Sequence, residues 1–373
     1  MLFSQTDKKW MKKALSLAEK GKGYVAPNPL VGCVIVSENG NVIGKGYHQR
    51  FGQAHAEINA LDSVKDKSAL VDATVYVTLE PCSHYGKTPP CAKKLSELPL
   101  KRIVVSMVDP NPAVNGKGIR MLKESGKEVE VGLLEDEAHR LNESFIHFTH
   151  YHKPFVTLKI AQTLDGYISA PDGDSKWITG EEARKMVHQW RSEYDAVMVG
   201  RNTVLLDNPR LTVRHIEGRQ PYRIVIDGDY GLSRELNVFN DQYEEKTIII
   251  THNKEKVNEI ADPMLSILQP NYFRGSTILV SEVDGHSDLD QALSKLADMS
   301  ISSILVEAGS RLASTMIKNR LVDKLHLFIS PKLLGGGSRS VLGLGINRMS
   351  EILELHDTSW EKVGDDMLMT GYF

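Results

Sequence analysis

Three residues in the first part of the chain have the chemistry of zinc ligands. His55 offers an imidazole nitrogen, and Cys82 and Cys91 offer thiolates. One nitrogen and two sulfurs leave a fourth tetrahedral position for water, which is the arrangement of a catalytic rather than a structural zinc site. Zinc lowers the pKa of such a water enough to supply hydroxide near neutral pH. The pattern therefore predicts a zinc-dependent hydrolytic site.

Glu57 follows His55 closely in the sequence, so its carboxylate can reach the site without being a ligand. A carboxylate placed there can take a proton from water and pass it to a leaving amine. The sequence H-x-E, followed later by Pro-Cys and a second cysteine, is typical of zinc-dependent base deaminases. We therefore expect Glu57 to transfer protons. In the alternative interpretation, His55 caps a helix and the two cysteines are buried thiols.

The elements around these residues have clear sequence patterns. Residues 73–80 form an apolar, β-branched run that predicts a buried strand ending just before Cys82. A helix is expected over 54–61, and a second helix should follow Thr88, its expected N-cap. Thiolates are favoured near the start of a helix, which supports the assignment of the cysteines as ligands.

The spacing of the two cysteines departs from the common deaminase pattern. Most base deaminases have two residues between them, whereas this chain has the segment from Ser83 to Pro90. The stretch from Glu80 to Cys91 resembles the bifunctional deaminase/reductase family of riboflavin biosynthesis, and the resemblance extends over nearly the whole chain. It implies a zinc enzyme that deaminates a diaminopyrimidinone ribosylamino phosphate and then reduces its ribosyl group to ribityl with NADPH. It also implies a homo-oligomer.

The resemblance assigns substrate contacts in this half of the chain. Asn28, in the sequence Asn-Pro-Leu-Val-Gly, matches an asparagine whose amide contacts the pyrimidine. His48, His84 and Lys87 match positions that face the substrate. By sequence alone these residues would belong to ordinary turns or loops. Lys87 is the better candidate for the phosphate, because it is a point charge in a glycine-containing loop.

The chain is longer than one ordinary domain. Its 373 residues and its hydrophobic fraction of 41% are sufficient for two cores. We expect a zinc-dependent pyrimidine deaminase domain over 1–150 and an NADPH-dependent reductase domain over 151–373. Strands alternate with helices in both halves, which predicts α/β layers. The resemblance implies a three-layer, cytidine-deaminase-like domain followed by a dihydrofolate-reductase-like domain.

The net charge is −3. This balance gives no reason to expect nucleic acid or an anionic membrane as a partner, and it disfavours the alternative of a nucleic-acid base deaminase with an accessory domain. No apolar run approaches the length of a bilayer span. Three cysteines, two of them in the proposed zinc site, fit a reducing cytoplasm, and Cys33 is expected in the core. A module in which zinc is purely structural is a second alternative.

The second half predicts strands over 154–161, 196–200, 223–226, 247–251, 277–280, 303–306 and 368–373. Asp165-Gly166 is expected to form a hairpin turn. Gly200 and Gly309 each follow a strand and precede a helical segment, where backbone amides can meet a phosphate. The chain has no G-x-G-x-x-G sequence, so an NADPH site cannot be argued from a Rossmann motif.

The reductase site is assigned by the resemblance. It implies an NADPH site lined by Ala161, Trp177, Thr203, Asp207 and Gly309. It implies contacts to the ribosyl phosphate or the pyrimidine from Lys159, Ser175, Arg191, Leu211, Arg214 and Glu307. Arginine suits phosphate because its guanidinium binds two oxygens at once. The helix dipole is an alternative explanation for Arg191, and a plain turn is an alternative explanation for Asp207.

Overall fold

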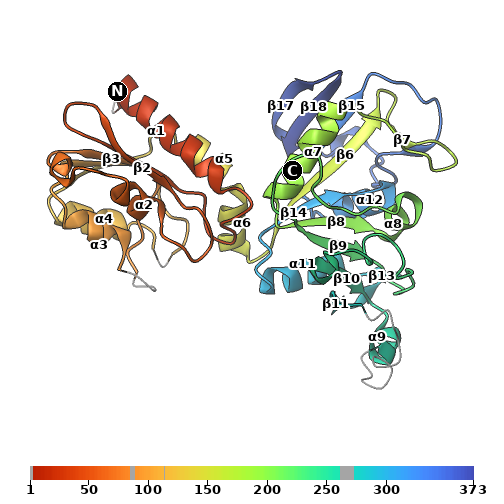
Figure 1. Cartoon of the computed structure of the whole chain (residues 1–373). Helices are drawn as coiled ribbons and strands as arrows, with labels where there is room; N and C mark the ends of the chain where they lie inside the picture. Colours follow the sequence, from red (N-terminus) through yellow and green to blue (C-terminus); the bar gives the residue numbers. More distant parts are fainter. Residues whose placement is uncertain (1–2, 85–88, 113, 261–272) are drawn as a thin grey trace. The chain divides into compact units, whose positions relative to one another are not determined.

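The computed structural model describes residues 3–84, 89–112, 114–260 and 273–373. The chain divides into two compact units, Met1–His152 and Lys153–Phe373, and Figure 1 shows the layers of each. Each unit has its own sheet and its own hydrophobic core. The two units are therefore described one at a time.

The first unit is built on a five-stranded sheet. In spatial order its strands are β2 (Val42–Tyr47), β1 (Gly32–Val36), β3 (Thr74–Leu79), β4 (Arg102–Met107) and β5 (Glu128–Val131). β1 is antiparallel to both of its neighbours, and β3, β4 and β5 are parallel. The strand expected over 73–80 is confirmed. Because both faces of a parallel strand are covered, β3 and β4 are buried along almost their whole length.

Helices cover both faces of this sheet. They are α1 (Gln5–Ala18), α2 (Ala56–Asp62), α3 (Cys91–Ser96), α4 (Lys117–Glu124), α5 (Glu135–Leu141) and α6 (Glu143–Tyr151). On one face, Met11 and Ala14 of α1 pack against Val34 and Tyr76. On the other face, α2, α3 and α4 pack against the alternate side chains of the same strands (Figure 1). The expected three-layer arrangement is confirmed.

A buried charge network connects α1 to the sheet. The carboxylate of Asp7, which is 5% exposed, accepts hydrogen bonds from Tyr76 Oη and from Arg102, each at 2.7 Å. It also accepts the backbone N–H of Ser4, the N-cap residue of α1. Burial alone would raise the pKa of Asp7, but the bonds from Arg102 and Tyr76 outweigh it and hold that pKa well below its ordinary value. The network therefore needs Asp7 in its ionised form.

We expect Asp7→Asn to weaken the attachment of α1 by about 2 kcal/mol, because Arg102 keeps its charge and loses one of its two carboxylate partners. The pKa of Asp7 is depressed by folding, so its stabilisation is complete above the unfolded value of about 3.9 and is lost as the pH falls below it. Amide hydrogen exchange of α1 in the full chain measures both effects. Equal exchange in wild type and variant at neutral pH would contradict the prediction.

The second unit is built on a nine-stranded sheet. In spatial order its strands are β11 (Ser276–Leu279), β10 (Thr247–Thr251), β9 (Tyr222–Ile226), β8 (Ala196–Gly200), β14 (Ser303–Glu307), β6 (Phe155–Thr163), β15 (Lys324–Ser330), β18 (Asp366–Tyr372) and β17 (His356–Val363). The sheet is parallel from β11 to β15 and antiparallel at the β18–β17 edge. All strands expected in this half are confirmed. β15 and β17 are additional strands that the sequence did not predict.

Helices cover both faces of this sheet as well. They are α7 (Glu181–Glu193), α8 (Arg201–Asp207), α9 (Lys254–Ile260), α11 (Leu289–Asp298) and α12 (Ser310–Lys318). α11 and α12 pack Leu296 and Met316 against one face, whereas α7 packs Val187 against Phe328 on the other. In the described part of the chain, no helix combines the length and the apolar character needed to cross a membrane.

Two short ribbons lie outside the main sheet: β7 (Tyr167–Ser169) with β16 (Ser338–Arg339), and β12 (Glu282–Val283) with β13 (His286–Ser287). Asp165-Gly166 turns the chain after β6, but β7 pairs with β16 instead of β6. The expected hairpin was therefore wrong. A distant contact holds the turn, because the carboxylate of Asp165 accepts the backbone N–H groups of Leu334 at 3.1 Å and Gly335 at 2.7 Å.

Candidate active sites

The three predicted zinc ligands converge in the first unit. The Nδ1 atom of His55 lies 3.6 Å from the sulfur of Cys82 and 3.4 Å from the sulfur of Cys91. The possible ligand atoms of the three residues all lie within 4.8 Å of one another. Among the residues that the structure describes, no other histidine, cysteine or acidic side chains are grouped in threes to hold a metal ion. One nitrogen and two sulfurs at this spacing fit a tetrahedral zinc with an open position.

Each ligand is positioned by the end of an element. Cys82 follows β3, Cys91 is the first residue of α3, and His55 is the N-cap residue of α2. The N-cap residue of α3 is Pro90; Thr88, which was expected at that position, lies outside the described residues. The backbone N–H of Cys91 donates to the Cys82 sulfur at 3.3 Å. Hydrogen bonds with Cys91 and His55 lower the pKa of the Cys82 thiol below its ordinary value, which favours the thiolate that a metal requires.

Glu57 lies in the first turn of α2 and is 3% exposed. Burial, reinforced by the negative charge of Cys82, raises the pKa of its carboxyl group to about 7. A group with that pKa exchanges a proton near neutral pH in either direction, as general acid–base catalysis requires. Glu57 also contacts Cys91. Its position is therefore suited to the proton transfer expected from the sequence.

Asn28 and His48 lie next to the histidine ligand. The side-chain amide of Asn28 is 3.2 Å from Nε2 of His48, and Nδ1 of His48 is 3.1 Å from the carbonyl oxygen of Ala54. Burial lowers the pKa of His48. The neutral ring thus donates from Nδ1 to Ala54 and accepts from Asn28 at Nε2. Because the His48 ring meets the His55 ring edge-on at 5.6 Å, both predicted substrate residues are oriented beside the cluster.

The other two predicted substrate residues of this unit, His84 and Lys87, belong to the segment between the two cysteines. His84 is exposed. Burial raises the pKa of Asp109, and the nearby His84 partly offsets that rise. Lys87 lies outside the described residues, so its contact with a phosphate stays a prediction.

The second unit has a large cleft, of about 2140 Å³, at the carboxyl ends of its central parallel strands. That edge is the usual ligand position in such sheets. Small-molecule sites usually occupy about 300–1,000 Å³, so the cleft has room for a dinucleotide and a second ligand. All residues that the sequence assigned to the reductase site line it, namely Lys159, Ala161, Ser175, Trp177, Arg191, Thr203, Asp207, Leu211, Arg214, Glu307 and Gly309.

An ion pair that is only slightly exposed lies within this cleft. Glu307, the last residue of β14, accepts hydrogen bonds from Nε and Nη2 of Arg191 at 2.6 and 2.9 Å, and it is the register partner of Lys159 on β6. Burial alone would raise the pKa of Glu307, but Arg191 and Lys159 outweigh it and lower that pKa to about 2. Nη1 of Arg191 donates to the carbonyl oxygen of Thr212 at 3.2 Å. The guanidinium of Arg191 is thus committed to protein partners.

Arg214 is better placed to bind an anion. Its Nη1 donates to the hydroxyl of Thr212 at 3.1 Å, and its backbone N–H donates to Nδ1 of His188 at 3.2 Å. Burial and the charge of Arg191 lower the pKa of Arg214. Within the described ranges no carboxylate forms an ion pair with it. Arg214 therefore presents a positive charge that an anionic ligand can neutralise.

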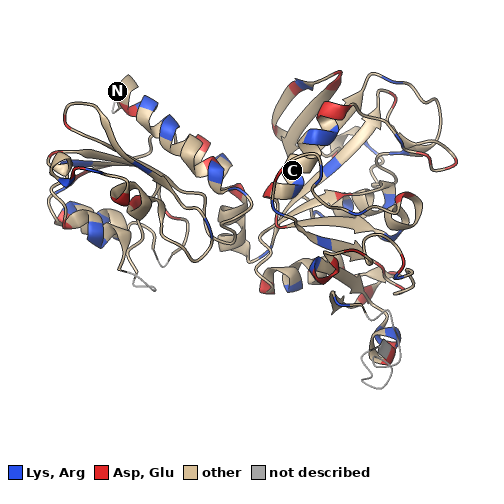
Figure 2. Cartoon of the chain, in the orientation of Figure 1, with Lys and Arg blue, Asp and Glu red and all other residues tan. Residues whose placement is uncertain are grey.

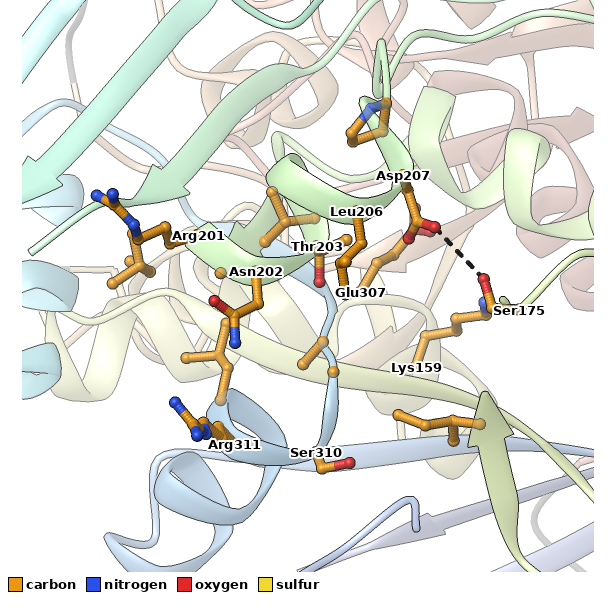
Figure 3. A pocket seen from close by; sticks show the side chains of 18 of the residues that line it. Lys159, Ser175, Arg201, Asn202, Thr203, Leu206, Asp207, Glu307, Ser310 and Arg311 are labelled. Atoms are coloured by element: carbon orange, nitrogen blue, oxygen red, sulfur yellow. Dashed lines mark hydrogen bonds between the residues drawn. The ribbon is translucent and has the colours of Figure 1, made fainter. Parts of the chain in front are cut away.

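Ser175 and Asp207 face each other at one end of the cleft, where the Ser175 hydroxyl donates to Asp207 at 3.4 Å (Figure 3). Trp177 is 65% exposed, and the guanidinium of Arg184 lies 4.6 Å from the centroid of its ring. Nζ of Lys332 donates to the carbonyl oxygens of Trp177 and Ile178 at 2.8 and 2.7 Å. The backbone of this segment is therefore held in place while the indole stays available to a ligand.

The starts of two helices line the other end of the cleft. Gly200 and Gly309 are the N-cap residues of α8 and α12. Figure 3 shows Thr203 and Ser310 near this position, with Arg311 at the same end. Free N–H groups in the first turn of a helix are natural donors to a phosphate. This end of the cleft is therefore suited to the phosphates of a dinucleotide.

Comparison with known proteins identifies both units. The family model "RibD C-terminal domain" matches residues 154–369, and "Cytidine and deoxycytidylate deaminase zinc-binding region" matches residues 4–107. The riboflavin biosynthesis protein RibD of Aquifex aeolicus is 41% identical over 369 residues, which cover 99% of each chain. The chain belongs to the RibD family. The RibD protein of Escherichia coli is 37% identical over 97% of this chain and 98% of its own.

Solved RibD structures match the whole chain. Acinetobacter baumannii RibD has a TM-score of 0.85 at 33% identity and covers 99% of both chains. The diaminohydroxyphosphoribosylaminopyrimidine deaminase/5-amino-6-(5-phosphoribosylamino)uracil reductase of Thermotoga maritima has a TM-score of 0.85 at 36% identity and covers 98% of both. The expected fold class, a deaminase-like domain followed by a RibD-type reductase domain, is confirmed. Zinc and NADPH are the cofactors of these two RibD domains.

Two residues that shape the sites, Glu80 and Lys332, were not predicted from the sequence. Glu80 was given no role, although it is 3% exposed and directly precedes Pro81-Cys82. An acid at the end of an apolar strand is a signal that could have identified it. No local signal marks Lys332, because its partner Trp177 is 155 residues away.

Proposed function

We infer that this chain is a bifunctional deaminase and reductase of riboflavin biosynthesis, with the deaminase over residues 1–150 and the reductase over 151–373. Its first substrate is 2,5-diamino-6-ribosylamino-4(3H)-pyrimidinone 5′-phosphate, and its final product is 5-amino-6-(5-phospho-ribitylamino)uracil. The observation that carries the proposal is the presence of two different sites in one chain: the His55–Cys82–Cys91 cluster with a buried Glu57, and the dinucleotide-sized cleft.

In the deaminase unit, His55, Cys82 and Cys91 would hold the zinc ion, which when bound supplies hydroxide near neutral pH. Glu57 takes a proton from the attacking water on its carboxyl oxygen and passes it to the amino group, which then leaves as ammonia. Asn28 binds the pyrimidine, and His48 keeps the Asn28 amide oriented. Burial of Glu57 limits the access of bulk water to the transferred proton.

In the reductase unit, NADPH when bound would supply a hydride, and the residues of the cleft would orient the ribosyl group to receive it. The turns at Gly200 and Gly309 and the side chain of Thr203 would bind the phosphates of the cofactor. Arg214 binds the substrate phosphate, and Ser175 and Leu211 line the same part of the cleft. Lys159 and Glu307 face the ribosyl group from adjacent strands. The buried Arg191 positions Glu307.

Product analysis by mass spectrometry tests this proposal directly. The purified protein is given the diaminopyrimidinone ribosylamino phosphate with and without NADPH. We expect the deaminated ribosyl product without the cofactor and the ribityl product with it. Deamination alone would contradict the reductase half, and reduction without deamination would contradict the zinc half.

Arg214→Met is expected to raise the Michaelis constant of the reductase about 10- to 100-fold, because charge-assisted hydrogen bonds to a phosphate contribute roughly 1.5–3 kcal/mol. The turnover number should change much less. Steady-state NADPH oxidation with the deaminated phosphate substrate measures both constants. The matched control is the dephosphorylated substrate, for which wild type and variant should have equal constants. An unchanged Michaelis constant with the phosphate would remove Arg214 as its anchor.

A small-molecule substrate fits the distribution of charge on the chain. Figure 2 shows basic and acidic residues interspersed along the helices of both units. Nucleic-acid sites usually have a basic stripe on one face. We also propose that the protein acts in the cytoplasm, because a reducing compartment keeps Cys82 and Cys91 available as thiolates.

The edge of the second sheet supports the proposal of a homo-oligomer. β17 is exposed at every position except Val363, and its Trp360 is 59% exposed. Unpaired strand edges with apolar side chains are common sites of association. We expect Trp360→Lys to reduce the mass measured by light scattering to that of one chain. A wild-type protein that is already monomeric at micromolar concentration would contradict the proposal.

A further inference from the structure

We propose that Glu80 is a positioning residue, which fixes the zinc ligand Cys82 by capping helix α4 from outside that helix. The proposal rests on the proposed function only in treating His55, Cys82 and Cys91 as a zinc site. Glu80 lies between the end of β3 and Pro81-Cys82. It is 3% exposed, so its carboxylate must have partners inside the protein.

The carboxylate of Glu80 accepts four backbone hydrogen bonds. Oε1 accepts the N–H groups of Gly118 at 2.8 Å and Ile119 at 3.3 Å. Oε2 accepts the N–H groups of Gly116 at 2.9 Å and Asp109 at 3.3 Å. Three of these donors belong to the start of α4, whose N-cap residue, Gly116, makes no side-chain cap. Glu80 therefore satisfies the free N–H groups of that helix, where a negative charge is also favoured by the helix dipole.

Helix α4 also touches the backbone that leads to Cys82. A Cβ atom at Gly118 would lie 2.0 Å from the carbonyl oxygen of Pro81, so the two backbones can approach this closely only because residue 118 has no side chain. The Cys82 carbonyl accepts the N–H of Ala92 at 3.1 Å, and its sulfur accepts the N–H of Cys91. The position of the sulfur thus depends on how α4 holds the Pro81 peptide.

A glutamine in place of Glu80 cannot make the same set of bonds. Its amide has one oxygen that accepts and one nitrogen that donates. Two of the four buried N–H groups would then face another donor and lose their acceptor. We expect α4 to shift away from Pro81 and the Cys82 sulfur to lose its fixed position. Loss of the groups that orient metal ligands typically lowers metal affinity about 10- to 100-fold.

The test is the rate of zinc transfer from the full-length protein to a chromogenic chelator, after the zinc content has been measured. Glu80→Gln and Gly118→Ala disturb the contact from its two sides, and both are expected to release zinc at least about tenfold faster than wild type. Asp7→Asn is the matched control, because it removes a buried carboxylate on the opposite face of the same sheet. Its release rate should equal that of the wild type.

Cobalt substitution gives a readout of geometry that does not depend on activity. The visible absorption of Co²⁺ bound to thiolates should change in Glu80→Gln and Gly118→Ala, and stay unchanged in Asp7→Asn and in Glu124→Gln, which alters an exposed acid on the same helix. NADPH-dependent reduction should be equal in all variants and shows that the second unit is folded.

Wild-type release rates in both Glu80→Gln and Gly118→Ala would overturn the proposal. Equal acceleration in Asp7→Asn would overturn it too, because general loosening of the unit would then explain the effect. If Glu80→Gln does not fold, Gly118→Ala alone decides between these outcomes. If the wild-type protein contained no zinc, the assignment of the metal site itself would be overturned. This result is distinguishable from a failure of the Glu80 proposal.

Discussion

Glu57→Gln is expected to slow deamination about a thousandfold while zinc stays bound. The amide has the size of the carboxyl group but cannot accept and return a proton, and such catalysis contributes roughly 10²–10⁴ to a rate. The cluster that holds the metal comprises His55, Cys82 and Cys91 without Glu57, so the zinc content should equal that of the wild type. Ammonia release from the diaminopyrimidinone substrate, together with metal analysis, measures both quantities.

The second unit provides the internal control for this experiment. The Glu57→Gln variant should catalyse reduction of supplied deaminated substrate at the wild-type rate, because the described residues that line the reductase cleft all belong to the second unit. Cys82→Ser should lose deamination and zinc together, which separates a ligand from a proton-transferring residue. Normal deamination by Glu57→Gln would exclude Glu57 from the mechanism.

Glu307→Gln is expected to slow reduction about a hundredfold and leave deamination unchanged. In the wild type, the Glu307 carboxylate binds two nitrogens of Arg191 and compensates the charge of the adjacent Lys159. A neutral amide leaves two largely shielded cations without their anion, and breaking a fully buried pair costs about 3–5 kcal/mol, which is an upper bound for this partly exposed pair. We expect the uncompensated charges to displace the side chains that face the ribosyl group. A shift of about 1 Å in alignment can cost 10²-fold in rate.

NADPH oxidation with the deaminated substrate measures this effect. Glu361→Gln is the matched control, since Glu361 is an exposed acid on β17 in the same unit. The pKa of Glu307 is lowered from 4.5 to about 2, so the pair stabilises the fold above the unfolded pKa and is lost only as the pH falls towards 2. A decline in wild-type reduction between about pH 5 and pH 8 that disappears in Glu307→Gln would contradict this account.

The strands that could be predicted are those whose burial is visible in their residues. β3 and β10 are buried at nearly every position, and their β-branched runs indicate this directly. β17 has no such pattern, because seven of its eight residues are exposed, and its pairing with β18 holds it in the sheet. The hairpin expected at Asp165-Gly166 failed for a related reason. The turn forms where its residues predict it, but β7 pairs with β16, which is distant in the sequence.

The two sites also differ in how far their residues could be predicted from local sequence patterns. His55, Glu57 and the two cysteines could be found because their side-chain chemistry is specific and their spacing is short. The residues of the reductase cleft came from family resemblance, and no local pattern joins Arg191 to Glu307 across 116 residues. The bonds to Glu80 come from backbone N–H groups, which every residue except proline carries. Contacts of that kind leave no pattern in a sequence.

The hydrogen bond between the two cysteine ligands is donated by the main chain and not by a side chain. The N–H of Cys91 donates to the sulfur of Cys82 at 3.3 Å, and hydrogen bonds of this kind reduce the electron density that a thiolate gives to a metal. No exchange of a side chain removes the donor, and replacing Cys91 itself would remove a ligand. The donor of this bond is therefore kept whatever side chains occupy the segment between the cysteines.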